Sequence, residues 1–429
     1  MRKFKFIALA ILLFIISSIL LLQIDDDLDP QAQSMYEQAI AHKESEAYLY
    51  LLGMQAAADE KPEVVGKTLM ASIRAAEKKY FENPHTQTFE YEDYPAEKSL
   101  PLPELGACAE KDCEYTDRLF AYPFNLEVLP EEQKVLLKRY KKLIAMRDFH
   151  TLSLPHIYVR LPAFQYLTKG NTLVSLEAIE KAKKGDLKKA KELLLNDISL
   201  LRFNLQQADT LITKIIYVSM ISKSLDVLSV VIHKYDSPTE ENIQSLTSDE
   251  RSLVKAMNYE YGFGHTLFKS LDKAPNLLST IDNSKEGNLP AWVSRILFKS
   301  NMTINAIFPA LRQVGEDSLL TSKAFTLKIA SDKPKPKEMS TIRNYAGTIL
   351  GRIVGPDFNP YISRVFALDA KIHLFNKTAN QAKLPTTLSH IRNPFYDDKA
   401  AYYSEDKKAV CVDVPLLDER KDYRCLRVK

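Results

Sequence analysis

Glycine is scarce in this chain, at 12 of 429 residues, which is about 3% against a typical ~7%. Phosphate-binding turns need glycine at fixed spacings, and neither G-x-G-x-x-G nor G-x-x-x-x-G-K followed by Ser or Thr occurs. The zinc-protease motif H-E-x-x-H and the nucleophile elbow G-x-S-x-G are also missing. We therefore assign no catalytic residue, no metal ligand and no cofactor, and we favour a protein that is not an enzyme.

The chain also lacks an excess of either charge once its first segment is set aside. Residues 1–24 carry Arg2, Lys3 and Lys5 and no acid, and the remainder has 55 basic and 55 acidic residues. Nucleic-acid-binding proteins normally carry a basic excess, so a nucleic-acid partner is excluded. Abundant Leu, Ala, Lys and Glu with few helix breakers predict a mostly all-α fold.

One long hydrophobic run lies near the start of the chain. Residues 6–24 carry no charge and span about 28 Å as a helix, close to the ~30 Å hydrocarbon core of a bilayer. The basic tip at 1–5 precedes the run, and four aspartates within 25–29 follow it. This pattern predicts a single-pass signal-anchor in a bacterial inner membrane, with a cytoplasmic N-terminus and the bulk of the chain in the periplasm.

A cleaved signal peptide is the alternative interpretation of this run. Its cleavage site requires small residues at two set positions, and no A-x-A pattern follows Ser17 and Ser18. The run is also longer than the ~7–15 residues of a usual signal core. We expect the segment to remain attached as a transmembrane helix.

The four cysteines form two pairs that are close in sequence, Cys108 with Cys113 and Cys411 with Cys425. An even number of cysteines in an oxidising compartment indicates disulfide bonds. Of the three pairings that four cysteines allow, we favour the two local ones because small loops close more readily. A zinc site is the alternative, and these spacings match its usual ligand pattern poorly.

Composition divides the chain after the anchor into three parts. Residues 25–332 read as a periplasmic helical domain, interrupted by an irregular proline-rich segment at 82–130. The alternating lysines and prolines of 333–339 predict a stiff, solvated linker. Residues 340–429 predict C-terminal helices followed by a small disulfide-tied β-hairpin.

Apolar periodicity predicts an irregular array of helical hairpins. It indicates helices over 35–54, after Pro62 and over 210–232, the last a buried core helix rather than a second membrane span. Residues 172–203 have the glycine turn between alanine-bearing helices that is typical of a tetratricopeptide unit. Ser237-Pro238 with Glu240 predicts a further helix start.

Two aromatic groups define a candidate ligand groove. In the first, two glycines interrupt an aromatic helix, so that a break exposing the aromatic rings and a histidine is one interpretation and a kinked core helix is the favoured one. The second follows Pro155. The candidate residues are Tyr259, Tyr261, Phe263, His265, Tyr158 and Arg160.

Several segments together resemble a family of proteobacterial envelope proteins for which no activity is established. They are AYLYLLGMQA at 47–56, the Cys108/Cys113 pair, LLKRYKKL at 136–143, DISLLRFNLQQADTLITKIIYVSMISKSLDVLS at 197–229 and LPTTLSHIRNPFYDDKAAYY at 384–403. The last is similar to a Pro-Phe-x-x-Lys hairpin cassette, although the usual Thr-Gly after Phe is Tyr396-Asp397 here. The resemblance implies an inner-membrane-anchored, mostly helical periplasmic protein, and it supplies no catalytic residues.

These observations lead to three expectations of function. The first is a membrane-anchored scaffold or protein-interaction module of the bacterial envelope, with an envelope protein as partner. The second is a periplasmic enzyme that acts on cell-wall or glycan material. The third is a small-ligand sensor that uses the 259–265 region, and fold alone does not decide among them.

Overall fold

The computed structural model describes residues 2–41, 44–82, 89–104, 115–273, 295–331, 343–354, 357–381, 384, 387–416 and 423–429. In this part of the chain the fold is mostly helical, as the composition predicts. The expected linker at 333–339 and the Cys108/Cys113 pair lie outside the described residues.

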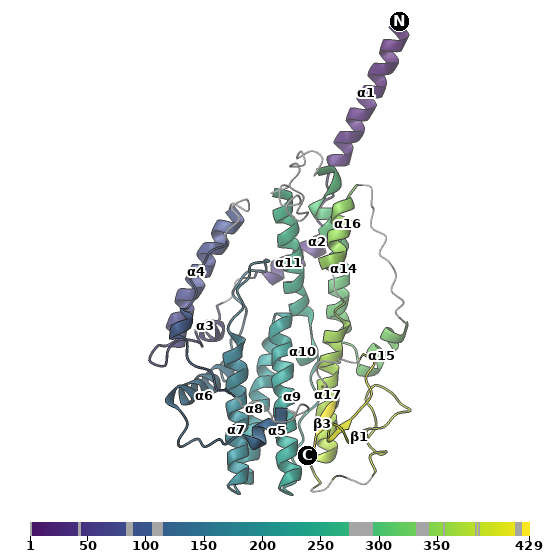
Figure 1. Ribbon diagram of the computed structural model, residues 1–429. Coiled ribbons are helices and arrows are strands. Elements are labelled where there is room, and N and C mark those ends of the chain that lie inside the picture. Colours follow the sequence, from purple (N-terminus) through teal and green to yellow (C-terminus); the bar gives the residue numbers. More distant parts are fainter. Residues whose placement is uncertain are drawn as a thin grey trace.

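The N-terminal part begins with a helix that projects from the body of the molecule, α1 (Arg2–Gln23) (Figure 1). It is followed by α2 (Pro30–Ala39), α3 (Glu46–Leu52) and α4 (Pro62–Glu82). The helix after Pro62 is therefore confirmed. The single helix predicted over 35–54 is wrong, since two helices occupy this stretch.

The break between α2 and α3 has a local cause. Ser45 accepts a hydrogen bond from the backbone N–H of Tyr48 at 3.0 Å and so caps a new helix. Asp148, from a distant loop, also accepts the N–H of Glu46, at 2.5 Å. Apolar spacing does not register such a restart, because the cap depends on hydrogen bonds of Ser45 and Asp148.

A bundle of long helices forms the core. It contains α6 (Glu131–Ile144), α7 (Phe164–Lys183), α8 (Leu187–Gln207) and α9 (Leu211–Lys234), and α8 packs against both α7 and α9. The turn between α7 and α8 uses Gly185 at φ 86°, a conformation that glycine adopts without strain. Helix α9 is 72% buried, which confirms that it is a core helix.

Three short helices lie outside this bundle in the described residues. They are the 3₁₀ turn η1 (Ala96–Lys98), α5 (Tyr115–Ala121) and α10 (Ser248–Arg251). Both η1 and α5 fall within the proline-rich stretch at 82–130.

The C-terminal half adds a second set of helices to the same core. They are α11 (Val254–Lys273), α14 (Ser300–Asp317), α15 (Ser322–Ser331), α16 (Tyr345–Val354) and α17 (Asn359–Thr378). Helix α11 packs on α14 and on α2, and α17 packs on α9. One hydrophobic cluster includes residues from before and after the predicted linker.

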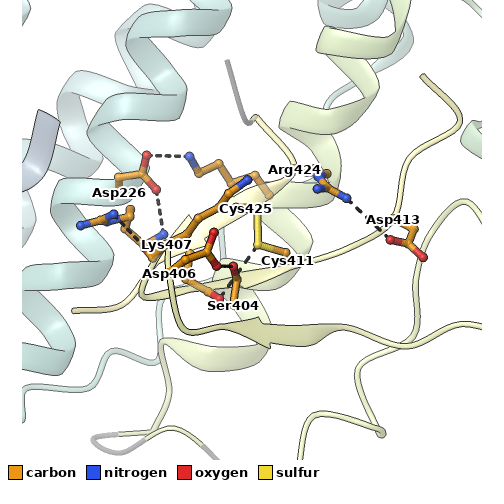
Figure 2. Close-up of a disulfide and its surroundings, with 11 residues drawn as sticks. Asp226, Ser404, Asp406, Lys407, Cys411, Asp413, Arg424 and Cys425 are labelled. Carbon is orange, nitrogen blue, oxygen red and sulfur yellow. Dashed lines mark hydrogen bonds and ion pairs between the residues drawn. A yellow bond between two sulfur atoms is a disulfide. The ribbon is translucent and has the colours of Figure 1, made fainter. Parts of the chain in front are cut away.

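Three short strands complete the chain at the end opposite α1 (Figure 1). β1 (Tyr402–Ser404), β2 (Ala409–Cys411) and β3 (Cys425–Arg427) pair antiparallel in that order. Cys411 lies opposite Cys425 in the β2–β3 register and is joined to it by a disulfide, with a Cα–Cα distance of 4.1 Å (Figure 2). The local pairing predicted for these two cysteines is therefore present.

The helix predicted after Ser237 is wrong, because residues 238–247 form neither helix nor strand. Side chains of α17 form hydrogen bonds with the backbone of this segment. Asn376 bonds both the N–H and the C=O of Ile243, and Asp369 accepts the N–H of Leu246 at 2.6 Å. The capping box instead occurs ten residues later, where Thr247 and Glu250 start α10.

Candidate membrane-anchoring site

Helix α1 is the one long apolar helix in the described part of the chain that packs on nothing. Its span Phe6–Gln23 is 0% buried, whereas the comparably apolar α9 is 72% buried. Exposed side chains of this kind, such as Phe14 at 73% and Leu21 at 65%, are unfavourable in water and favourable in a bilayer. This helix has the length and exposure of a membrane anchor or of a signal sequence.

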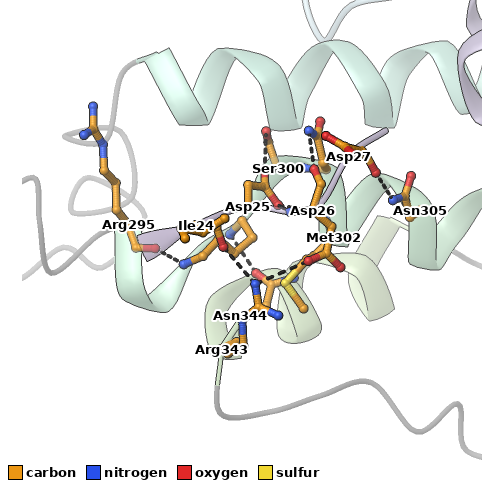
Figure 3. A network of polar contacts seen from close by, with 12 residues as sticks. Ile24, Asp25, Asp26, Asp27, Arg295, Ser300, Met302, Asn305, Arg343 and Asn344 are labelled. Carbon is orange, nitrogen blue, oxygen red and sulfur yellow. Dashed lines mark hydrogen bonds and ion pairs between the residues drawn. The ribbon is translucent and has the colours of Figure 1, made fainter. Parts of the chain in front are cut away.

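Asp25, two residues after the end of α1, is fixed to the body by a helix that is distant in sequence. Asp25 accepts backbone N–H groups of Asn301 at 2.8 Å and of Met302 at 3.1 Å (Figure 3). The hydroxyl of Ser300 donates to the same carboxylate at 3.3 Å. The first N–H groups of a helix have no intrahelical partner, so Asp25 caps α14 from 275 to 277 residues away in sequence.

The residues after Asp25 are held through their backbone groups. The amide of Asn301 donates to the carbonyl of Asp26 at 2.7 Å, and Asn305 donates to the carbonyl of Asp27 at 2.8 Å. Asn305 then accepts the N–H of Asp29 at 2.9 Å. We call residues 24–29 the neck, and α14 binds it along two helical turns.

A third segment, directly before α16, also contacts the neck. Arg343 donates to the carbonyl of Ile24 at 2.9 Å and pairs with Asp26 at 3.3 Å. Asn344 bonds Thr303 of α14 at 2.9 Å, and Gly347 lies so close to Thr303 that a Cβ would be 2.1 Å from its hydroxyl. Gly347 thus serves the close packing of α16 on α14.

Helix α2 continues the docked segment into the core. It buries Ala32 and Met35, and Tyr36 stacks on His265 of α11 with ring centroids 3.7 Å apart. Near its end, Asn258 of α11 donates to Gln38 at 2.9 Å. The chain is therefore attached to the body continuously from Ile24 to Gln38, so that α1 leaves the body from a defined position.

The first group predicted for a ligand groove, at 259–265, lies in one unbroken helix, α11. Tyr259 and Tyr261 are buried, and the hydroxyl of Tyr259 donates to the carbonyl of Ser153 at 2.9 Å. Phe263 packs edge-on against Tyr259, with centroids 5.2 Å apart. His265 is buried beneath α2.

The glycines of α11 allow close packing rather than a break. A Cβ on Gly262 would lie 2.4 Å from Cγ of Pro155, so this position admits no side chain. The interpretation in which the helix breaks to expose the rings is therefore wrong, and Gly262 has the packing role that the favoured interpretation, a core helix, gave it.

Tyr158 and Arg160 lie in a separate aromatic cluster. Tyr158 stacks with Phe89 at 5.7 Å and meets Tyr80 edge-on at 5.6 Å. Arg160 pairs with Asp93 and lies 5.2 Å from the ring centroid of Tyr91. No described contact joins these two residues to the 259–265 group.

A buried polar network that the sequence analysis missed crosses the core bundle. Asp197 accepts hydrogen bonds from Tyr140 at 2.7 Å, Asn171 at 2.9 Å and Ser224 at 3.2 Å, which come from α6, α7 and α9. Burial raises the pKa of Asp197 to about 6, against the lowering effect of these donors. A lone acid within an apolar helix pattern was the available signal, although its partners are not local.

A second buried network connects the disulfide-tied sheet to α9 (Figure 2). Asp226 accepts the ammonium of Lys371 at 2.7 Å and the backbone N–H of Arg427 at 2.9 Å. Lys371 is 1% exposed and also donates to Ser222 at 2.9 Å. Since a buried charge needs a partner, Asp226 makes the positions of α17 and β3 depend on each other.

The surface has grooves with polar linings. One of about 660 Å³ lies between α8 and residues 241–250, where Arg202 pairs with Glu250 at 2.7 Å and Arg147 lies over the ring of Phe203. Another of about 410 Å³ is bordered by Asp369, whose pKa is raised by burial. That carboxylate already accepts a backbone N–H, so it is engaged in structure.

Metal-binding chemistry finds no support in the described ranges, which contain no group of three or more His, Cys, Asp or Glu side chains arranged to hold a metal ion. Comparisons with protein families, with curated proteins and with solved structures give no match to this chain. The functional conclusion therefore depends on the geometry of this molecule alone.

Proposed function

We propose that this protein is a membrane-anchored scaffold of the bacterial envelope, with α1 in the inner membrane and the helical body in the periplasm. The observation that carries the proposal is the docked neck: an exposed apolar helix continues into residues that α14 and Arg343 bind directly. A flexible tether would serve simple attachment. A docked neck in addition presents the body at a set orientation to the membrane.

The side of the membrane follows from charge and from cysteine chemistry. Basic residues before α1 and aspartates after it favour a cytoplasmic N-terminus. The Cys411–Cys425 disulfide supports an oxidising compartment for the body.

Arginine substitutions inside α1 test the anchoring. Leu12→Arg combined with Ile15→Arg places two charges near the middle of the span, at a cost of about 2.5–3.5 kcal/mol for each residue. We expect the full chain to resist extraction from membranes by alkaline carbonate, and the double variant to be released.

A matched control keeps this test specific. Val128 and Leu327 are exposed apolar residues of the body, at 77% and 71%, so their arginine double variant adds the same charge outside α1. Release of both double variants, or of neither, contradicts the anchoring role of α1.

The partner surface that we propose is the groove beside the tetratricopeptide-like pair α7–α8, with another envelope protein as partner. Its lining combines two arginines, three acids and the ring of Phe203, a mixture suited to a polar peptide segment. A photo-crosslinking benzoylphenylalanine in place of Gln206 lies in this groove. The same group in place of Lys188 lies on the exposed far end of α8.

We expect Gln206 replacement to crosslink one envelope protein reproducibly in intact membranes, and Lys188 replacement not to do so. Crosslinks that are the same at both positions, or missing at Gln206, contradict the proposed surface.

An enzyme that acts on cell-wall or glycan material is a second candidate, favoured by one observation. Asp369 borders a groove and has a raised pKa, as a general acid requires. If this candidate is right, the full chain hydrolyses purified peptidoglycan and Asp369→Asn abolishes the activity. Equal release of soluble fragments by both proteins, or none by either, rejects it.

A further inference from the structure

The contact between α2 and α11 contains a buried histidine. His265 is 7% exposed, and its ring stacks on Tyr36 at 3.7 Å with an interplanar angle of 23°. Neither ring nitrogen has a hydrogen-bond partner among the residues that the structure describes. A neutral imidazole tolerates such a site better than an imidazolium, which needs acceptors for two N–H groups.

The groups around this ring offer no compensation for a positive charge. From α11, Tyr261 lies one turn before His265 and Lys269 one turn after it, and Lys269 donates to Asn301 of α14. From the α2 side, Tyr36 covers the ring, and Asp29 acts electrostatically on Tyr261. Burial, with a smaller effect from Lys269, lowers the pKa of His265 to about 4.

Helix α2 is an element that can separate from the body at modest cost. It is ten residues long and fully buries only two side chains, Ala32 and Met35. Its polar attachments to α11 and α14 include those of Gln38, of Gln31, which accepts from Arg312, and of its N-cap Asp29. Separation exposes His265 to water, where an imidazole has its ordinary pKa and accepts a proton freely.

We propose that α2 and its binding surface on α11 form an acid-sensitive latch, in which protonation of His265 releases α2 and leaves the neck bound to α14 and Arg343. The release of α2 does not rest on the proposed anchoring, since it depends on contacts within the body. The signal that releases α2 is therefore the binding of a proton to His265.

Hydrogen exchange of the full chain in detergent micelles measures the latch. After correction for the intrinsic pH dependence of exchange, the opening equilibrium of α2 amides is expected to rise roughly a hundredfold from pH 7 to pH 4, while α7–α9 stay protected. An α2 that stays protected at pH 4 overturns the proposal. So does loss of protection by α2 and α7–α9 together.

Two variants separate His265 from other acid effects. His265→Phe keeps a ring against Tyr36 and removes the titrating group, so we expect α2 to stay closed at pH 4. His373→Phe is the matched control, because burial also lowers the pKa of His373 but this residue lies on α17. The control should open like the unsubstituted chain.

A milder variant tests the role of His265 in the release of α2 if His265→Phe does not fold. Lys269→Gln removes the nearest like charge, so release of α2 should shift to lower pH. Release of the His265→Phe or Lys269→Gln variant in the same pH range as the unsubstituted chain overturns the proposal. Failure of membrane retention would remove the proposed anchoring and leave these exchange results unaffected.

Discussion

At the scale of single residues, the carboxylate of Asp25 is the side chain of the neck that caps α14. Asp25→Ala removes the acceptor for the first N–H groups of α14 and should lower the free energy of unfolding by about 1 kcal/mol. Denaturant unfolding of the full chain in detergent measures this loss. Asp27→Ala is the control, since the bond of Asp27 to Asn305 uses its backbone carbonyl.

The account of the neck fails if the two alanine variants lose the same stability. It also fails if exchange at the first turn of α14 is unchanged in Asp25→Ala, because the cap acts on those amides.

The buried carboxylate of Asp197 makes stability depend on pH in the direction opposite to His265. Its pKa is raised from 3.8 to about 6 in the folded state, so its favourable contribution is full below pH 3.8 and is lost as pH rises toward 6. This amounts to up to about 3 kcal/mol. Asp197→Asn should remove that slope between pH 4 and 6 in unfolding titrations, and an identical slope in both proteins would falsify the assignment.

The sequence indicated one role for the aspartates of the neck and did not predict the contact of Asp25 with α14. Four aspartates after an apolar run indicate membrane topology, and nothing local shows that Asp25 caps a helix 275 residues later. The pairing of Lys371 with Asp226 is hidden in the same way, because each residue appears as an isolated charge in an apolar helix. Long-range polar contacts have no periodicity from which to predict them.

At the scale of elements, the disulfide keeps β3 in position against α9. Replacing both Cys411 and Cys425 with Ser removes a 14-residue closure and should cost about 3 kcal/mol, seen as a lower Tm. It also loosens the backbone of Arg427, which donates to the partner of buried Lys371.

A surface pair next to the same sheet is the control for this prediction. Lys399 and Asp413 form an ion pair at 2.9 Å with 44% and 41% of their side chains exposed, so Lys399→Ala should lower the Tm far less than the serine double variant does. A serine double variant that melts together with Lys399→Ala would contradict the structural role of the disulfide.

Helices with an apolar face were predictable, and the places where the chain changes direction were not. Helix α4 follows its 3.6-residue periodicity, and α9 is apolar on most of its circumference, as a buried core helix is. The prediction of a helix after Ser237 was wrong because side chains of α17 accept the backbone N–H groups of this segment. A local capping signal does not reveal these distant partners. The aromatic pattern at 259–265 found buried residues, and it did not reveal that α2 covers them.

At the scale of the whole molecule, α1 and the disulfide-tied sheet lie at opposite ends of one helical body (Figure 1). One large hydrophobic cluster extends through that body. The body is therefore expected to move together with the docked neck. An anchored protein of this form can set the position of a bound partner relative to the membrane.

The most direct test of this account is the intact mass of the protein extracted from the membrane fraction of cells that produce the full chain. Retention of α1 predicts a membrane-bound species with the full mass of 48.9 kDa, less only the mass of the hydrogen atoms lost when disulfides form. A soluble species that lacks the apolar segment would contradict the account, since the neck would then hold no membrane helix.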